Sequence, residues 1–384
     1  MFVIDAFGAR WAFDVSGVEP ALGDELRRLW GRARVEPAAG ARADDAPPFV
    51  VRRIDAATLE VHGTPHRVVD ADVPYAVSRA LTMASILRRS GECLMLHAAG
   101  LATSDGGTVA LVAASGTGKT TASRVLGTAL GYVSDETVSV EHDLTVRAYP
   151  KPLSVVTDPG APHGKHERSP QELGLLPAPP RLSLSAIVVL RRSADTASPV
   201  LEPVSLVEAM GEVLPQTSAL PSLDRPLDRL ATALTTGHGP WRLVYRDIGD
   251  CVQLLTDLAH GRHPQGQPHE VTWEWVDGTA SDPVTAADAV PSPAWTRAPF
   301  RDAVVSDGDA LVMLDRVPVT LPGLAATVWR AAARPTTLDD LVAVATTEHG
   351  PHPDAPTVVA ATLDSLVERG VMLAALDPAA TRPA

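Results

Sequence analysis

The stretch from residue 113 to residue 121 has the most specific chemical pattern in the chain. It reads Ala-Ala-Ser-Gly-Thr-Gly-Lys-Thr-Thr, the phosphate-loop pattern with alanine in place of the first glycine. Successive backbone N–H groups of such a loop surround phosphate oxygens, and the helix that follows directs the positive end of its dipole toward them. The pattern therefore predicts a nucleotide-binding site. Its predicted residues are Ala113, Ser115, Gly116, Thr117, Gly118, Lys119, Thr120 and Thr121.

The residue types in this stretch have separate tasks. Glycines at 116 and 118 let the backbone approach phosphates closely, because they carry no Cβ. Lys119 supplies a positive charge to the β and γ phosphates, and the Thr120 hydroxyl is a ligand for Mg²⁺. ATP and Mg²⁺ are therefore the expected cofactors. A chance glycine-rich turn is the alternative, and the strand and helix expected on either side of the loop argue against it.

Two further features belong to the expected chemistry. Asp135 and Glu136 follow the next predicted strand, where a carboxylate can hold Mg²⁺ or take a proton from an attacking hydroxyl. The alternative is a solvated pair of acids at a strand end. His97 directly follows the strand predicted at 94–96. It either faces the nucleotide or only caps the end of that strand.

The elements that must position these residues read as an α/β sheet. A strand at 108–113 leads into the loop, and a helix at 120–130 follows it. Further strands are predicted at 94–96, 131–133, 137–140, 145–148 and 184–190. Ahead of them, the patterns predict a hairpin at 2–15, helices at 20–35 and 74–89, and short strands at 49–53 and 58–62.

Composition excludes several classes of protein. Among 384 residues the net charge is −13, which argues against a general nucleic-acid binder. No apolar run approaches the ~20 residues of a membrane span, and two cysteines exclude a disulfide framework. A cytoplasmic location is the default expectation. The chain has only three lysines, Lys119, Lys151 and Lys165, so each is a better candidate for a role than a typical lysine.

The order of these motifs resembles the kinase core of the HPr kinase-related proteins, which have the phosphoenolpyruvate carboxykinase-like phosphate-loop fold. The matching stretches are 96–100, 115–121, 133–136, 149–153, 184–190 and 243–248. The resemblance implies that Asp135 is the catalytic base on a serine hydroxyl and that His97 matches the family's upstream histidine. Glu136 replaces an acid that is commonly Asp, and the Asn-containing signature beyond the core has no counterpart. The HPr substrate and the phosphorylase activity are therefore not implied.

The last segment has a different pattern. Three short strands are predicted at 303–305, 310–314 and 317–321, and three helices at 324–333, 338–347 and 356–369. Thr337 and Asp340 resemble a capping box, and Gly370 is placed for a helix C-terminus. This winged-helix-like order resembles the PqqD-like domain, the precursor-recognition element of peptide natural-product pathways.

The second resemblance implies a binding mode. A leader peptide would add as a strand beside the third strand, 317–321, and pack on the third helix, 358–369. Pro318 is tolerable there only if that strand lies at a sheet edge. A DNA-binding winged helix is the competing reading, and it fits badly because the third helix carries one arginine and two acids.

These expectations define four regions: an N-terminal α+β segment (1–90), a phosphate-loop α/β kinase domain (91–260), a Pro-rich linker (261–300) with a candidate short strand at 271–276, and a leader-peptide recognition domain (301–376). The expected function is ATP-dependent phosphorylation of a Ser or Thr hydroxyl on a ribosomally made precursor peptide. Asp135, His97 and Lys119 would be catalytic, and Thr120, Asp135 and Glu136 would hold the metal. The alternative is an adaptor that presents the precursor to a separate maturation enzyme, with a regulatory or degenerate nucleotide site.

Overall fold

The computed structural model describes residues 1–36, 46–67, 73–114, 116–156, 165–262, 271–279 and 293–375. Ser115 of the predicted phosphate loop lies outside the described residues. The chain forms two compact units. The described residues of the first lie within 1–204, 212–224 and 233–262, and those of the second within 205–211, 225–232 and 271–375. Among the described residues, no helix has the length and apolar character needed to cross a membrane.

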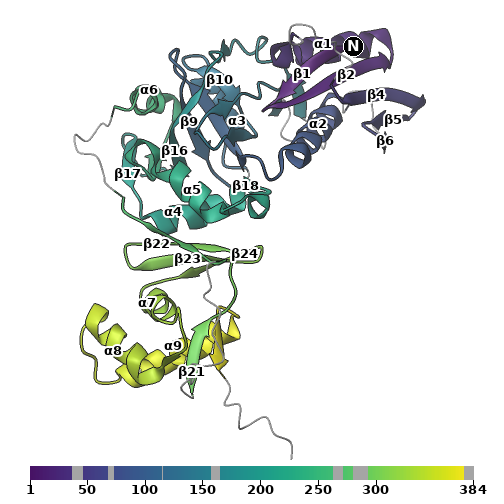
Figure 1. The fold of residues 1–384 in the computed structure, drawn as a ribbon. Helices are drawn as coiled ribbons and strands as arrows, with labels where there is room; N and C mark the ends of the chain where they lie inside the picture. The colour runs from purple at the N-terminus through teal and green to yellow at the C-terminus, as the bar shows by residue number, and fades with distance from the viewer. Residues whose placement is uncertain are drawn as a thin grey trace, which may run out of the picture. The chain divides into compact units, whose positions relative to one another are not determined.

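The first unit opens with a six-stranded sheet in the order β3-β1-β2-β4-β5-β6 (Figure 1). Its elements are β1 (Phe2–Ala6), β2 (Ala9–Gly17), α1 (Pro20–Leu29), β3 (Arg34–Val35), β4 (Pro48–Asp55), β5 (Thr58–Val61), β6 (Thr64–Arg67) and α2 (Val73–Arg89). The expected hairpin, strands and second helix are confirmed. The first helix ends at Leu29 rather than at 35, because Arg34 and Val35 pair with β1 instead of continuing the helix.

A seven-stranded sheet in the order β15-β10-β8-β9-β16-β19-β17 follows in the same unit. Its elements and the helices between them are β8 (Ala98–Ala102), β9 (Gly107–Val112), α3 (Lys119–Leu126), β10 (Gly131–Ser134), β15 (Leu176–Pro177), β16 (Ser183–Arg192), β17 (Val200–Pro203), β19 (Trp241–Tyr245) and α6 (Val252–Ala259). Its strands β8, β9 and β16 are mostly buried and rich in valine, leucine and alanine, as expected for the covered centre of a sheet. The α/β expectation is confirmed, although α3 stops four residues before the predicted end.

Two smaller sheets are built from strands that come before or between those of the seven-stranded sheet in the sequence. One has the order β12-β11-β7-β18, and the other is the hairpin β13-β14. Their strands are β7 (Leu94–Leu96), β11 (Val138–Val140), β12 (Val146–Arg147), β13 (Leu153–Val156), β14 (Lys165–Arg168) and β18 (Thr217–Ser218). Strand β7 therefore ends just before His97, and β8 begins just after it.

The second unit contains two sheets, in the orders β20-β22-β23-β24 and β25-β21-β26, and the helices α7, α8 and α9 (Figure 1). The bounds are β20 (Glu274–Asp277), β21 (Ala294–Arg297), β22 (Asp302–Ser306), β23 (Asp309–Leu314), β24 (Val317–Leu321), α7 (Leu324–Ala331), β25 (Thr336–Thr337), α8 (Leu338–His349), α9 (Ala355–Glu368) and β26 (Met372–Ala375). The three expected strands and three helices are confirmed. Strands β20 and β21 come from the stretch expected to be a linker.

Helix ends in this unit follow the expected local chemistry. The Thr337 side chain accepts a hydrogen bond from the Asp340 backbone N–H at 3.3 Å and caps α8. Gly370 follows α9 with a φ of 68°, the left-handed conformation in which helices often end.

Two segments from the middle of the chain also belong to the second unit, as most of α4 (Leu206–Val213) and of α5 (Pro226–Thr235). Asp302 at the start of β22 accepts hydrogen bonds from the backbone N–H groups of Leu227 (2.9 Å) and Asp228 (3.3 Å) in the first turn of α5. Arg225, just before that helix, stacks 3.6 Å from the ring centroid of Trp275 on β20. The sequence alone carries no signal for this cap from a residue about 75 positions away.

Candidate functional site

The seven-stranded sheet brings the predicted site residues to one edge. Strand β8 is antiparallel to both β9 and β10, so β9 and β10 run in the same direction. The loop after β9 and the acids after β10 therefore leave the sheet at the same edge. Because β8 runs the other way, its first residues lie there too, directly after His97. The topology thus explains why His97, the described residues 113–114 and 116–121 of the loop, and the acids at 135–136 come together.

The loop backbone has the conformation that its glycines permit. Gly116 and Gly118 have φ values of 83° and 101°, and the space where a Cβ would stand is open at both positions. Gly118 is the N-cap of α3, which begins at Lys119. Lys119 Nζ donates to the carbonyl oxygen of Ala113 at 2.6 Å, and it lies 3.4 Å from the carbonyl oxygen of Ala114. Burial lowers the pKa of Lys119, and Asp135 and Glu136 oppose that shift.

Asp135 is joined directly to the loop helix. Thr120 Oγ1 donates to Asp135 Oδ2 at 3.1 Å, which places the predicted metal-binding hydroxyl against the predicted carboxylate. The Tyr132 hydroxyl donates to Asp135 Oδ1 at 3.0 Å. Asp135 itself is only 6% exposed. Both of its oxygens therefore accept hydrogen bonds within the protein.

Sequence reasoning assigned no role to Lys151, the second lysine at this site. Its ammonium lies 3.2 Å from Asp135 Oδ1 and 3.3 Å from Glu136 Oε2, and it donates to the carbonyl oxygen of Pro152 at 2.8 Å. Burial lowers the pKa of Lys151, but Asp135, Glu136 and Glu167 outweigh that effect and raise the pKa well above its ordinary value. The rarity of lysine in the chain was the available signal.

A third carboxylate, also buried, acts on the same lysine. Glu167 on β14 accepts hydrogen bonds from the hydroxyls of Ser154 and Ser78. Burial raises the pKa of Glu167, and Lys151 opposes that shift. Glu136 differs from the other two acids because 39% of its side chain is exposed. The cluster therefore presents one carboxylate to solvent and keeps two inside.

His97 lies at the same edge but has no hydrogen bond to the acids among those described. Its backbone N–H donates to the carbonyl oxygen of Gln216 at 2.6 Å. Burial lowers the pKa of its imidazole, and the charge of Lys119 lowers it further, while Glu136 and Asp135 act in the opposite direction. A neutral imidazole beside the loop is the result at neutral pH.

The residues present fit a nucleotide-bound Mg²⁺ rather than a metal held by protein alone. In the described part of the chain, no three His, Cys, Asp or Glu side chains gather as a metal site. Mg²⁺ in nucleotide sites takes one or two protein ligands and completes its shell with phosphate oxygens and water. Thr120 and Asp135, 3.1 Å apart, supply such a pair. When bound, the ion would neutralise charge on the phosphates.

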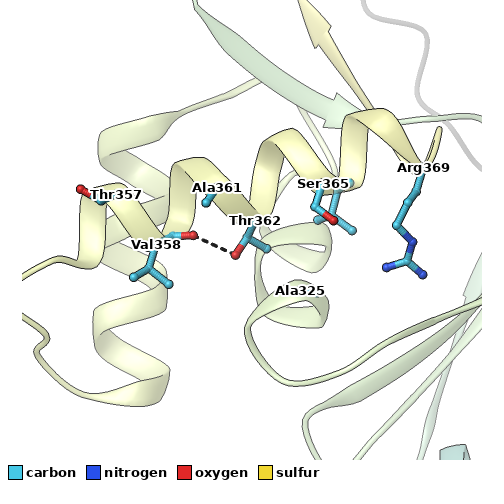
Figure 2. Close-up of a pocket in the computed structure, with 8 residues that line it drawn as sticks. Ala325, Thr357, Val358, Ala361, Thr362, Ser365 and Arg369 are labelled. Atoms are coloured by element: carbon cyan, nitrogen blue, oxygen red, sulfur yellow. Dashed lines mark hydrogen bonds between the residues drawn. The ribbon is translucent and has the colours of Figure 1, made fainter.

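A separate groove lies on the second unit, along one face of α9 with Ala325 of α7 (Figure 2). Its volume is about 430 Å³. Small side chains dominate the part of α9 that lines it, and Arg369 stands at one end. The lining residues are Ala325, Thr357, Val358, Ala361, Thr362, Ser365, Leu366 and Arg369.

Strand β24 lies at the edge of its sheet among the described strands, as Pro318 requires. The β23–β24 register pairs Met313 with Pro318 and Leu311 with Thr320. The Thr320 carbonyl oxygen accepts a hydrogen bond from Arg369 at 3.1 Å, so it points away from β23. Because backbone groups alternate along a strand, the N–H of Thr320 faces the open edge and that of Val319 faces β23.

Comparisons with known proteins found weak similarity to solved structures alone. No protein-family model matches the chain, and no curated protein matches it. Among solved structures, the chain is similar to the HPr(Ser) kinase/phosphatase from Coxiella burnetii, with 10% sequence identity and a TM-score of 0.24. That match covers 43% of this chain and 93% of the other.

Proposed function

We propose that the first unit is an ATP-dependent phosphotransferase. One observation carries the proposal: Lys119 and Thr120 begin the helix after the glycine loop, and Thr120 is hydrogen-bonded to Asp135 at the same sheet edge. A chance glycine-rich turn would have no reason to place a carboxylate from another strand on that hydroxyl. The arrangement is the one that Mg²⁺ and the phosphates of ATP need.

The reaction would be phosphoryl transfer to a Ser or Thr hydroxyl. The hydroxyl oxygen bonds to the γ-phosphorus, the bond from that phosphorus to the β–γ bridging oxygen breaks, and ADP leaves. Asp135 takes the hydroxyl proton. Lys119 would stabilise charge on the transferred group, Thr120, Asp135 and Glu136 would hold the metal, and His97 would lie near the phosphates as a neutral group.

The acceptor in this proposal is a ribosomally made precursor peptide. Its leader would bind the second unit, at the open edge of β24 and in the groove along α9. Main-chain hydrogen bonds to the edge would supply affinity, and the groove would select side chains. Attachment of the leader raises the local concentration of the acceptor, so the phosphotransfer site itself needs little affinity for it.

Asp135→Asn tests the chemistry. The parent protein, ATP, Mg²⁺ and the product of a short gene found beside its own gene should give a peptide heavier by one phosphoryl group. The variant keeps the size of the side chain but accepts no proton, so the rate should fall by about 10²–10⁴-fold. The control is Asp143→Asn, an exposed acid that accepts a hydrogen bond from the backbone N–H of Thr145. Equal rates for parent and Asp135→Asn would refute the role of Asp135.

A second function has its own supporting observation. Asp135 is buried and both of its oxygens are already engaged, which favours a binding site over a base open to a substrate. The second unit would then be an adaptor that presents the leader to another enzyme, and nucleotide would regulate it. No phosphopeptide from the parent protein, together with a partner's modification that needs this chain and survives Asp135→Asn, would favour this function.

A further inference from the structure

Lys151 is a fully buried lysine, 3% exposed, that follows β12 and precedes β13. Its ammonium faces Asp135 Oδ1 at 3.2 Å and Glu136 Oε2 at 3.3 Å, and its remaining bond goes to a backbone carbonyl oxygen at 2.8 Å. With only 3% of its side chain exposed, the ammonium is not open to a substrate or nucleotide. What it contacts instead is the pair of acids assigned to the chemistry.

The contacts on Asp135 divide between its two oxygens. Oδ1 contacts both Lys151 and the Tyr132 hydroxyl, whereas in the part of the chain that the structure describes Thr120 alone contacts Oδ2. Two buried partners on one oxygen fix the rotation of the carboxylate, and that rotation directs the other oxygen to the loop hydroxyl. A surface ion pair would leave the carboxylate free to turn.

Repulsion between the carboxylates is a second reason why Lys151 matters for their position. Asp135 and Glu136 are adjacent in the chain, and Glu167 also acts on the same ammonium. Without a cation between them, these carboxylates would repel one another, and water would screen the buried Asp135 and Glu167 least. Lys119 is directed to the loop carbonyls, so Lys151 is the cation that holds the pair together.

We propose that Lys151 is a positioning residue that fixes Asp135 and Glu136 beside Thr120, and thereby sets the place of the metal ion at the nucleotide. This inference rests on the proposed nucleotide site. It does not depend on the identity of the acceptor, because Lys151 acts on the acids and touches no substrate. Lys151 would therefore affect turnover and metal geometry more than nucleotide affinity.

The test uses the full chain with Lys151→Met, which keeps the apolar stem and removes the charge. The probes are ATP·Mg²⁺ for hydrolysis and Mn²⁺·ADP for electron paramagnetic resonance. We expect kcat for hydrolysis to fall about 100-fold, the usual cost of a misplacement near 1 Å. The affinity for nucleotide should change by less than about threefold, a small step in binding free energy, because Lys151 contacts the acids and not the loop. The Mn²⁺ spectrum should change, which a purely structural ion pair would not produce.

Two further variants separate positioning from loss of stability. Tyr132→Phe removes the other partner of Asp135 Oδ1, so its effect on kcat should not add to that of Lys151→Met. Tyr149→Phe removes a buried hydroxyl that pairs with Thr82 at 2.8 Å, so it is the matched control and its effect should add. If Lys151→Met does not fold, Lys151→Arg keeps the charge but moves the donors, and the same spectral change is expected.

The outcomes are distinct. A parent protein that binds no Mn²⁺·ADP refutes the proposed nucleotide site, and this inference with it. A parent that binds it, together with a variant whose spectrum and turnover are unchanged, refutes the role of Lys151 alone. If the effects of Lys151→Met and Tyr132→Phe on kcat were additive, the proposal would also be overturned, since the two residues would then act separately. If the parent binds nucleotide but does not hydrolyse it, the spectrum alone decides.

Discussion

The phosphate-loop edge of the first unit and the α9 groove of the second are built in different ways. At the loop edge, buried charges contact one another, and Asp135 alone joins Thr120, Tyr132 and Lys151. In the groove, small side chains leave a shallow space, and one exposed arginine contacts the neighbouring strand. A site of buried, mutually dependent groups is expected to fail on one substitution, because each loss leaves another charge without its partner. A shallow groove spreads its contacts over many residues. Peptide binding there is therefore expected to be lost only when a larger side chain fills the groove.

The largest effect is expected from Lys119→Ala. Loss of a charged contact to the phosphates should weaken ATP·Mg²⁺ binding by about 100-fold, or ~3 kcal/mol. A thermal-shift titration measures this, because ligand stabilises the native state by mass action. Arg124→Ala, an exposed charge on the same helix, should keep the full shift. An unchanged shift in Lys119→Ala would show that the two sites do not differ as described.

The groove should respond to filling rather than to loss of charge. Ala361→Trp places a large ring in the space along α9 and should weaken leader-peptide binding about tenfold or more, with little change in melting temperature. Ala343→Trp, on the exposed face of α8, is the matched control. Fluorescence anisotropy with a labelled leader measures both. Equal affinities of the parent protein and Ala361→Trp for the leader would show that the groove is not part of the recognition site.

Two glycines test the backbone in each region. Gly118→Ala and Gly370→Ala both place a side chain at positive φ, 101° and 68°, with no neighbouring atom to clash. Each should lower the free energy of unfolding by about 1 kcal/mol. Only Gly118→Ala should also weaken nucleotide binding, since its backbone belongs to the loop. Chemical denaturation and ATP titration of the two variants separate these effects.

The smallest effect concerns pH and the cap of α5. Burial raises the pKa of Asp302, although the backbone N–H groups of Asp228 and Leu227 oppose the shift. A carboxyl with a raised native pKa binds more protons folded than unfolded, so its contribution to stability is present at low pH and declines as pH rises through the native pKa. Asp302→Asn keeps an acceptor for the cap and removes the titration. The stability of the parent relative to this variant should fall between acidic and neutral pH in thermal melts. A constant difference would refute the linkage.

Local patterns accounted for much of the fold. The glycine loop between β9 and α3, the hairpin β1–β2, and the strands and helices β22–β24 and α7–α9 follow apolar periodicity and turn residues. Where the expectation failed, long-range pairing was the reason. Arg34 and Val35 join β1 instead of extending α1, and β21 arises in the stretch expected to be a linker because it pairs with β25 and β26.

The sequence alone was enough to identify the glycine loop, its lysine and threonine, and the acid pair as candidates, because each is a short run of neighbouring residues. Only the tertiary structure decided that β8 runs against β9 and β10, which brings His97, the loop and Asp135 to one edge. It also decided that Lys151 and Tyr132 share one oxygen of Asp135, and that Asp302 caps a helix 75 residues earlier in the chain. Contacts of this kind depend on strand order and burial, which are properties of the whole packed chain and have no local signature.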